Sequence, residues 1–523
     1  MTLVVESLAG AIADYAVYIF PTLIILYFFR NYFYNGLNQY PGPIWAKFSN
    51  LWRFLDVSHR RPDITHLSLH RKYGDVVRLG PDTLSFADPA AIKTIYGLNK
   101  GFVKSEFYPV QMTTSKGEPL PSLFSTLDES YHASLRRSVN HAFSMTSLVQ
   151  YEPMVDETTQ VFLNQTAKLY ASTGEICDFA RWLQFFAFDV IGNITYSKRH
   201  GFIEKNEDIE GIIKSLSRIF DYAGVVGQMP WLDKMCWKNP LFDVLQKWGI
   251  MDNSHPVAVF ARQRMQERMT TDTDNQKPPT KPGYKDDLLT MFLKARENRP
   301  EFMTEKRVLT MATSMAFAGS ETTAISIAAV FYYLLKNPSC MIRVQKEIDD
   351  AVRAGIVENR STGLVSWIES QKLPYLDACV KEAFRMHPAA GLPLERVVPP
   401  AGIEIAGNFI PGGTIVGCNA WVIHRRQEVF GSDVDNYIPE RWLTASDEKL
   451  KIMNTTMFQF GAGSRTCIGK NISLMEIYKT VPSVLRRFDI QLAYPDEEWK
   501  LWNAWFVRQH NFNTIFKERA TRV

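Results

Sequence analysis

The run VLTMATSMAFAGSETTAISIAAVFYYLL, residues 308–335, most constrains what this chain can fold into. Its only charged side chain is Glu321. A helix that is apolar on all sides either lies inside a large core or crosses a membrane. An acid at mid-bilayer is expensive, and Gly319 in a helix interior costs about 1 kcal/mol relative to alanine. We therefore favour a central buried helix over the alternative, a membrane span.

A second apolar run, LAGAIADYAVYIFPTLIILYFF, covers residues 8–29 and carries one charge, Asp14. It is long enough to cross about 30 Å of hydrocarbon, and it lacks the basic start and shorter apolar core of a cleaved signal peptide. The nearby basic residues Arg30, Lys47 and Arg53 all follow it. The positive-inside rule then predicts a single-pass anchor with the body of the protein in the cytoplasm. The alternative is the buried first helix of a soluble domain.

The segment YPGPIW, residues 40–45, predicts a stiff hinge because its two prolines fix φ and the glycine between them permits a sharp turn. It divides the chain into an anchor with its flank, residues 1–39, and one large domain, residues 40–523. We expect that domain to be mainly α with small β-sheets. Its six scattered cysteines argue against a disulfide framework, and the net charge of +4 is too small to indicate nucleic acid.

Four segments carry the local structure predictions. The alternation and turn residues of 73–89 predict a strand pair, whereas helical periodicity dominates residues 131–336. The proline-rich polar stretch 270–287 predicts a surface loop. Residues 402–421 predict a hairpin that turns at Pro411-Gly412-Gly413.

The segment FQFGAGSRTCIGK, residues 458–470, is built around Cys467. Gly463 and Gly469 permit backbone geometry that turns peptide N–H groups toward the sulfur. The helical pattern that follows places the thiol beside a helix N-terminus, where negative charge is favoured. Arg465 lies two residues earlier, within reach of the anionic edge of a flat cofactor. These features predict a thiolate metal ligand rather than an inert buried thiol.

This segment resembles the haem-binding segment of the cytochromes P-450, with Phe460, Gly463, Arg465, Cys467 and Gly469 at the family's spacing. The resemblance implies the cytochrome P-450 fold, with a single large haem domain preceded by an N-terminal transmembrane helix. It also implies haem b as the cofactor, with Cys467 as the axial ligand of the iron.

Two further segments resemble elements of the same family. KEAFRMHP, residues 381–388, contains Glu382 and Arg385, and IPERW, residues 438–442, supplies Arg441. The resemblance implies a buried Glu–Arg–Arg cluster behind the haem. The role of this cluster is structural, because removing one partner of a buried ion pair is severely destabilising.

AGSETT, residues 318–323, resembles the family's oxygen-activation element. By that resemblance, the small pair Ala318-Gly319 leaves a groove for dioxygen. Thr322 donates a hydrogen bond to dioxygen, and Glu321 connects to a proton source. The alternative is that these polar groups bond back to their own helix.

The helix YHASLRRSVNHAF, residues 131–143, resembles the family's third major helix. His132 stands where a tryptophan is common, so it either hydrogen-bonds a haem propionate or packs. The resemblance assigns Arg136 and Arg396 to the propionates more directly, since arginine matches carboxylate geometry.

Together these features predict a membrane-anchored monooxygenase that hydroxylates or otherwise oxidises a lipophilic small molecule with O2. The chain has no Gly-rich dinucleotide fingerprint, so NADPH electrons are expected from a separate cytochrome P-450 reductase, with cytochrome b5 as a possible second donor. The pattern is most similar to fungal microsomal, pisatin-demethylase-like members, many of which serve secondary metabolism. This implies a location in the endoplasmic reticulum membrane with the catalytic domain on the cytoplasmic side. The alternatives are a haem-thiolate isomerase or dehydratase that needs no reductase, and a non-catalytic membrane-anchored binding protein.

Overall fold

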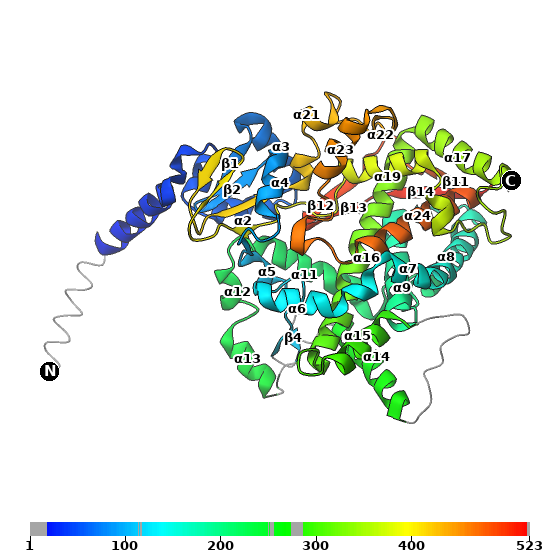
Figure 1. The fold of residues 1–523 in the computed structure, drawn as a ribbon, viewed down its shortest axis with the longest axis horizontal. Helices are drawn as coiled ribbons and strands as arrows, with labels where there is room; N and C mark the ends of the chain where they lie inside the picture. The colour runs from blue at the N-terminus through cyan, green and yellow to red at the C-terminus, as the bar shows by residue number, and fades with distance from the viewer. Residues whose placement is uncertain are drawn as a thin grey trace.

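A computed structural model describes residues 18–519, except 113, 116–117, 249, 251–255 and 274–285. Helices form most of the body (Figure 1). The longer ones are α3 (Pro62–Tyr73), α6 (Glu129–Val139), α8 (Glu152–Thr166), α9 (Phe179–Tyr196), α11 (Ile212–Val226), α14 (Pro256–Thr273), α15 (Leu288–Asn298), α16 (Glu305–Lys336), α17 (Pro338–Arg353), α19 (Pro374–Met386), α23 (Asp447–Thr456) and α24 (Lys470–Arg487). The shorter ones are α2 (Leu51–Ser58), α4 (Pro89–Ile95), α5 (Phe107–Val110), α7 (Met145–Leu148), α10 (Phe202–Lys205), α12 (Trp231–Met235), α13 (Pro240–Lys247), α18 (Trp367–Ser370), α20 (Ala420–Ile423), α21 (Gln427–Phe430) and α22 (Arg441–Thr444).

Helix α16 is the central element of the core. It packs along α9 and also contacts α14, α15, α19 and α24. Among the described helices it alone is long and apolar enough to cross a membrane, yet 72% of its most apolar stretch is buried inside the protein. The prediction of a buried central helix is confirmed, and Glu321 lies within it at 2% exposure.

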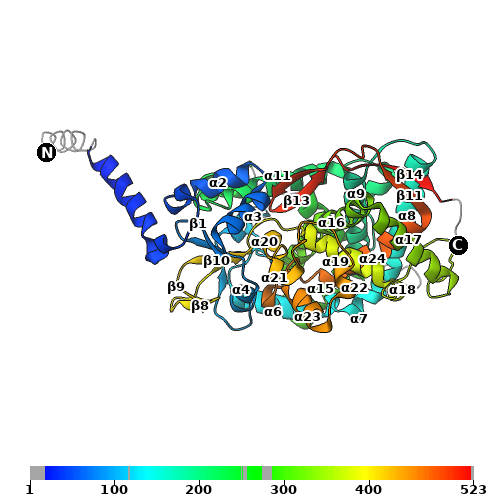
Figure 2. The ribbon, with the colours of Figure 1, turned by 90° about the horizontal axis from the view of Figure 1, so that it is seen from above.

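Strands β1 (Val76–Gly80) and β2 (Thr83–Phe86) lie at the end of the body from which the N-terminal helix projects, whereas β11 (Phe488–Leu492) and β14 (Asn513–Glu518) lie at the opposite end (Figures 1 and 2). β1 and β2 pair antiparallel, which confirms the predicted strand pair. The five-stranded sheet has the order β1 (Val76–Gly80), β2 (Thr83–Phe86), β10 (Ile415–Cys418), β7 (Arg396–Val397), β3 (Val103–Lys104). A three-stranded sheet has the order β11 (Phe488–Leu492), β14 (Asn513–Glu518), β6 (Cys177–Asp178). Three strand pairs complete the sheets: β12 (Lys500–Ala504) with β13 (Phe506–His510), β4 (Thr114–Ser115) with β5 (Glu118–Pro119), and β8 (Ile403–Ile405) with β9 (Asn408–Ile410).

The predicted hairpin is present, but the predicted position of its turn, Pro411-Gly412-Gly413, is wrong. The chain reverses at Ala406-Gly407, between β8 and β9, where φ is +48° and +76°. Two consecutive positive φ values suit the right-handed twist of a two-residue hairpin. Residues 411–413 instead lead into β10, which pairs with β2 and β7 in a different sheet.

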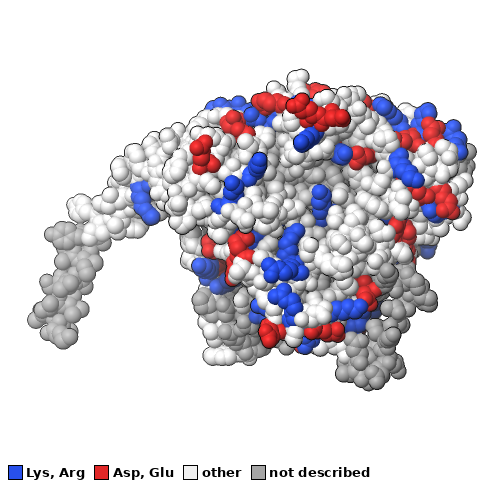
Figure 3. Space-filling model, in the orientation of Figure 1, with Lys and Arg blue, Asp and Glu red and all other residues white. Residues whose placement is uncertain are grey.

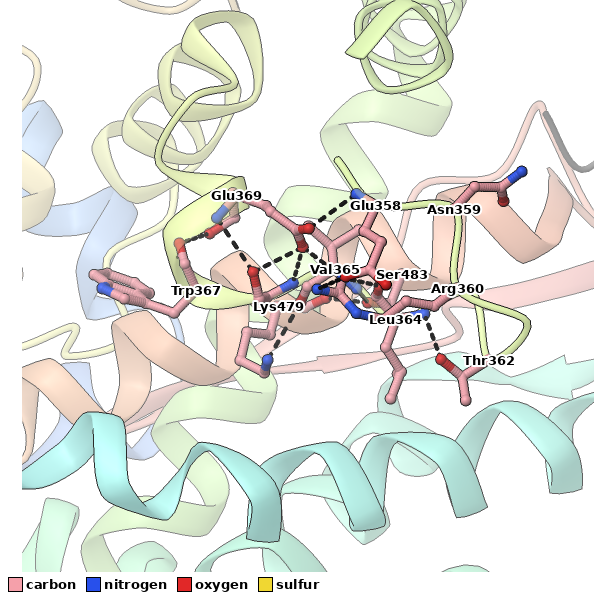
Figure 4. Close-up of polar contacts among 12 residues, drawn as sticks. Glu358, Asn359, Arg360, Thr362, Leu364, Val365, Trp367, Glu369, Lys479 and Ser483 are labelled. Atoms are coloured by element: carbon pink, nitrogen blue, oxygen red, sulfur yellow. Dashed lines mark hydrogen bonds and ion pairs between the residues drawn. The ribbon is translucent and has the colours of Figure 1, made fainter. Parts of the chain in front are cut away.

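Helix α24, which begins three residues after Cys467, is tied at its far half to the loop before α18 (Figure 4). Ser483 accepts a hydrogen bond from Val365 N at 3.0 Å. Lys479 is buried and pairs with Glu152 at 2.5 Å and Asp156 at 2.8 Å. These contacts fix the helix whose N-terminus supports the candidate metal ligand.

The N-terminal segment leaves the body as a helix over residues 18–32 (Figure 1). Residues 8–17 of the predicted anchor lie outside the described part of the chain. Residues 18–29 contain no charged side chain and are exposed, for example Tyr18 at 71% and Phe20 at 67%. The alternative of a buried first helix is therefore wrong for the described part of this segment. Of the predicted loop 270–287, the first four residues belong to α14, and 274–285 lie outside the described residues.

Candidate active site

The Cys467 thiol lies at the end of a tight loop between α23 and α24. The Cys467 N–H donates to Phe460 O at 2.9 Å, which closes the loop. The N–H groups of Gly469 and Lys470 are directed at the sulfur. The thiol remains accessible, although the protein surrounds it closely enough for burial to raise its pKa, and the two N–H groups act in the opposite direction. This donor arrangement favours a thiolate bound to a metal.

The loop glycines serve different purposes. Gly463 has φ +66°, and a Cβ there would lie 1.7 Å from the Tyr96 carbonyl oxygen, so only glycine fits. Gly461 has φ +67°. Gly469, by contrast, has φ −83°, which any residue adopts. Its predicted conformational role is therefore wrong, and its contribution is the N–H directed at the sulfur.

Two of the predicted propionate arginines lie beside this loop. Arg136 Nη1 donates to Thr466 O at 2.8 Å, which brings α6 against the residue before the thiol. Arg396 Nη1 donates to Tyr108 Oη at 3.2 Å, and its guanidinium lies 5.0 Å from the centre of the Tyr96 ring. Both guanidiniums retain further donors for an anionic ligand.

Arg465 is already paired in this structure. Its Nη2 lies 2.7 Å from Glu129 of α6, and its Nη1 donates to Leu123 O at 3.1 Å. The side chain is nearly buried, at 5% exposure. Sequence reasoning assigned Arg465 to the cofactor edge without foreseeing this carboxylate partner.

Two more buried bases belong to the same cluster. Lys104 of β3 donates to Phe124 O, and its ammonium lies 4.1 Å from the Tyr108 ring centre. Burial, together with Arg396 and Arg465, lowers the pKa of Lys104 well below its usual range. Burial and four neighbouring cations likewise lower the pKa of His132 to about 3, so His132 is neutral. This excess of bases over acids suits a ligand that carries carboxylates.

The Glu382 cluster is fully assembled on the other side of the loop. Arg385 contacts the Glu382 carboxylate at 2.7 and 2.9 Å, and Arg441 contacts it at 2.9 Å. Trp442 Nε1 also donates to it at 2.9 Å, and Ile438 N at 3.0 Å. Phe384, on the same helix, packs edge-on against Phe460 with ring centres 5.4 Å apart. The cluster thus braces the segment that leads to the thiol.

Helix α16 opens locally at Ala318. This residue is exposed although its neighbours along the helix are mostly buried. Of the pair Ala318-Gly319 that is predicted to leave a groove, Ala318 is the exposed residue. A Cβ on Gly319 would meet Ile191 of α9 at 3.0 Å, so that glycine permits close packing of two helices. Thr323 Oγ1 donates to Ser473 Oγ of α24 at 3.1 Å, which holds this part of α16 beside the thiol-bearing loop.

The acid and the alcohol of α16 behave differently. Thr322 Oγ1 donates to Ala318 O at 2.7 Å, as the back-bonding alternative predicts, and its oxygen remains free to accept. Glu321 has no hydrogen-bond partner at either carboxylate oxygen. Burial raises the pKa of Glu321 to about 7, and Arg508 acts in the opposite direction. Such a group exchanges a proton at physiological pH.

These residues fit a haem. A single accessible thiol ligand with N–H donors, a cluster of buried cations for two propionates, and an open helix face at Ala318 are what a thiolate-bound porphyrin requires. Within the described residues, no group of three or more His, Cys, Asp or Glu side chains gathers to bind a metal ion directly.

Sequence reasoning missed Lys104, Glu129 and Arg508. Lys104 and Glu129 lie more than 300 positions from Cys467, and Arg508 lies in a strand whose alternation gives no sign of a buried acid opposite it. Only the tertiary fold brings them to the site.

Comparisons with known proteins agree with this geometry. Residues 40–511 match the family described as Cytochrome P450. The cytochrome P450 monooxygenase cicH of Emericella nidulans is 41% identical over 497 residues, which cover 95% of this chain and 96% of the relative. A cytochrome P450 monooxygenase of Aspergillus terreus is 40% identical, over 87% of this chain and 91% of the relative. The monooxygenase asR2 of Sarocladium schorii is 35% identical, over 94% of each chain.

Proposed function

The chain belongs to the cytochrome P450 family, and we propose that it is a membrane-anchored monooxygenase that oxidises a lipophilic small molecule. As a family member it is a haem-thiolate enzyme that takes a small-molecule substrate, O2 and electrons from a redox partner. Bound haem supplies the reduction of O2 and the insertion of one oxygen atom into the substrate. The observation that carries the assignment is the accessible Cys467 thiol facing two peptide N–H groups.

The chain's own residues divide the remaining work. Cys467 would bind the haem iron, in the loop that Phe460 and Gly463 shape and with the Gly469 N–H directed at its sulfur. Arg136 and Arg396 would bind the propionates, and Arg465 pairs with Glu129 of α6. His132 would hydrogen-bond a propionate or pack beside it.

Glu321 and Thr322, both on α16, would handle the protons that the reduction of dioxygen consumes. Glu321 gives up a proton from its carboxyl group during the reduction of dioxygen and regains one from water. Thr322 orients dioxygen by turning its hydroxyl hydrogen toward it from Ala318 O, to which it donates in this structure. This pair disfavours the isomerase or dehydratase alternative, in which no protons are consumed from solvent.

Two exposed apolar surfaces support membrane attachment. The first is the helix at residues 18–32, whose residues 18–30 are exposed. The second lies on and after α12 and α13, which are on the same side of the body in Figure 1. It includes Trp231, Met235, Leu241 and Trp248, with exposures of 54%, 64%, 63% and 73%. Tryptophan is favoured at membrane interfaces, and apolar area this large is otherwise unfavourable in water.

The basic residues after the uncharged stretch 18–29 favour a cytoplasmic catalytic domain in the endoplasmic reticulum membrane. Arg30 is exposed, whereas Arg53 is buried against Glu395 and so is no flanking charge. Figure 3 shows the described part of the projecting segment almost free of charged side chains. In this location NADPH-cytochrome P450 reductase, and cytochrome b5 as a second donor, supply the electrons. Oxidation of a fungal secondary metabolite is the role that the fungal relatives favour.

A carbon monoxide difference spectrum of the reduced protein tests the assignment. We expect the band typical of thiolate ligation in haem-loaded wild type and its loss in Cys467→Ala, with Cys236→Ala as the control at the other accessible cysteine. Absence of the band from haem-loaded wild type would refute the proposal. Product formation without reductase would favour the isomerase alternative, and failure to bind any lipophilic compound would refute the substrate class.

A further inference from the structure

The buried acid Glu321 faces the guanidinium group of Arg508 without forming a hydrogen bond to it. Arg508 Nε lies 3.5 Å from Glu321 Oε1, and the two groups share no hydrogen bond. Arg508 lies on β13, which packs against α16. A buried ion pair normally closes to direct hydrogen bonds to offset its desolvation cost, so this open spacing needs a cause.

The cause is a competing carboxylate. Arg508 forms its short contact with Asp221 of α11 through Nη2, whereas its Nε faces Glu321. Asp221 is fixed in turn by Trp502 Nε1 of β12, at 2.9 Å. Arg60 donates to Asp221 O at 3.1 Å, and its guanidinium lies 5.2 Å from the centre of the Trp502 ring. Asp221 is 32% exposed, whereas Arg508 is 11% exposed.

We propose that Arg508 is a positioning residue for Glu321, and that Asp221 holds Arg508 back so that Glu321 is free to carry a proton. This inference rests on the proposed function, in which Glu321 delivers protons to the site of oxygen reduction. Glu321, Arg508, Asp221 and Arg60 together carry one net positive charge when Glu321 is protonated, and none when Glu321 is ionised. The uncompensated charge of the protonated state falls on Arg60, whose side chain is 18% exposed. Loss of the Glu321 proton therefore brings the group of four to neutrality.

Other charged groups near α16 do not substitute for this pair. Arg508 and Asp221 are the charged side chains that shift the pKa of Glu321, after burial. His387, directly after α19, lies 2.9 Å from Gln509, which donates to Ile325 O of α16; burial lowers the pKa of His387 to about 3, so it remains neutral. His510, at the end of β13, also has its pKa lowered, by burial and then by Arg508.

The test is the titration of Glu321 itself in the haem-loaded enzyme. Infrared difference spectra of wild type minus Glu321→Gln isolate the carbonyl band of the protonated acid, and its loss with rising pH gives a midpoint. We expect a midpoint near 7 in wild type. Arg508→Gln should raise it and Asp221→Asn should lower it, each by about one pH unit, a tenfold change in proton affinity.

Three variants complete the design. Arg508→Lys keeps the charge and should restore most of the wild-type midpoint. Lys500→Gln, an exposed change on the same hairpin, should leave the midpoint unchanged. The pH profile of product formed per NADPH should move with the infrared midpoint in each variant. The inference is overturned if Arg508→Gln and Asp221→Asn shift the midpoint in the same direction, or no more than Lys500→Gln does. The carbon monoxide band separates this outcome from failure of the proposed function, since the band depends on Cys467 and not on Arg508.

Discussion

Two buried glutamates, Glu382 and Glu321, show how differently one side chain is used in this protein. Glu382 is fully buried and accepts hydrogen bonds from two arginines, one tryptophan and one peptide N–H. Glu321 is equally deep, at 2% exposure, and accepts none. The first carboxylate is tied in every direction, whereas the second is left free to gain or lose a proton.

The difference separates a rigid structural site, the Glu382 cluster, from a site that can react, Glu321. A buried charge with all its partners specifies one geometry, which suits the brace behind the Cys467 loop. A buried acid without partners is costly to retain unless its proton is used. The two glutamates should therefore respond in opposite ways to the same chemical change, the replacement of a carboxylate by an amide.

The largest effect is expected for Glu382→Gln. The amide cannot neutralise Arg385 and Arg441, so two buried guanidiniums lose their shared counter-charge. Breaking such a cluster costs about 3–5 kcal/mol. We expect a large fall in the thermal unfolding midpoint and poor incorporation of haem, measured by the carbon monoxide band per protein. Glu428→Gln, at an exposed carboxylate paired with Arg426, is the matched control and should have little effect. Wild-type stability in Glu382→Gln would mean that the cluster does not brace the loop.

Glu321→Gln should instead stabilise the protein above neutral pH. The folded-state pKa of Glu321 is about 7, against 4.5 for an ordinary glutamate, so the folded protein holds this proton more tightly. The corresponding stability is complete below about pH 4.5 and is lost as the pH rises through 7. A shift of this size is worth at most about 3 kcal/mol. At pH 8 the amide variant avoids the loss, and at pH 4.5 the two proteins should match. Thermal unfolding midpoints across this range measure the difference. A pH-independent gap would contradict the prediction.

Trp442→Phe tests how much one hydrogen bond to Glu382 contributes to the stability of its cluster. It removes one N–H donor from the carboxylate and leaves both arginines in place. Loss of a hydrogen bond to a charged group costs about 2 kcal/mol. We expect an intermediate fall in the unfolding midpoint, measured at pH 8, with the carbon monoxide band retained. An effect as large as that of Glu382→Gln would show that the arginines alone do not hold the cluster.

The sequence predicted those parts of the site whose residues are close along the chain. Cys467 was indicated by the residues of its own segment, and the pair Glu382–Arg385 by the resemblance of its helix to a family element. The buried α16 followed from its apolar composition and its single acid, Glu321. These features are local, so a short segment carries most of the information that fixes them.

Features that depend on tertiary pairing were not predictable in the same way. Gly319 was assigned to the open face, but its missing side chain faces Ile191 of α9. The turn at Ala406 requires a positive φ at a residue that rarely adopts one, so Pro411-Gly412-Gly413 was the more obvious candidate. Arg508 lies 187 positions from Glu321, and nothing in its own strand marks it as the partner of a buried acid.

The smallest effect on stability is expected for Thr322→Ala, next to Glu321. The hydroxyl that it removes bonds only to the carbonyl oxygen of Ala318, so the unfolding midpoint should change little, by less than about 1 kcal/mol. The carbon monoxide band should persist, because Cys467 is untouched. Product formed per NADPH should fall, since dioxygen loses its orienting hydroxyl group. Ser326→Ala, which removes a similar back-bonded hydroxyl one turn further along α16, is the matched control and should leave coupling unchanged. Equal coupling in wild type and Thr322→Ala would assign Thr322 to the helix alone and leave Glu321 as the sole proton-handling residue of this segment.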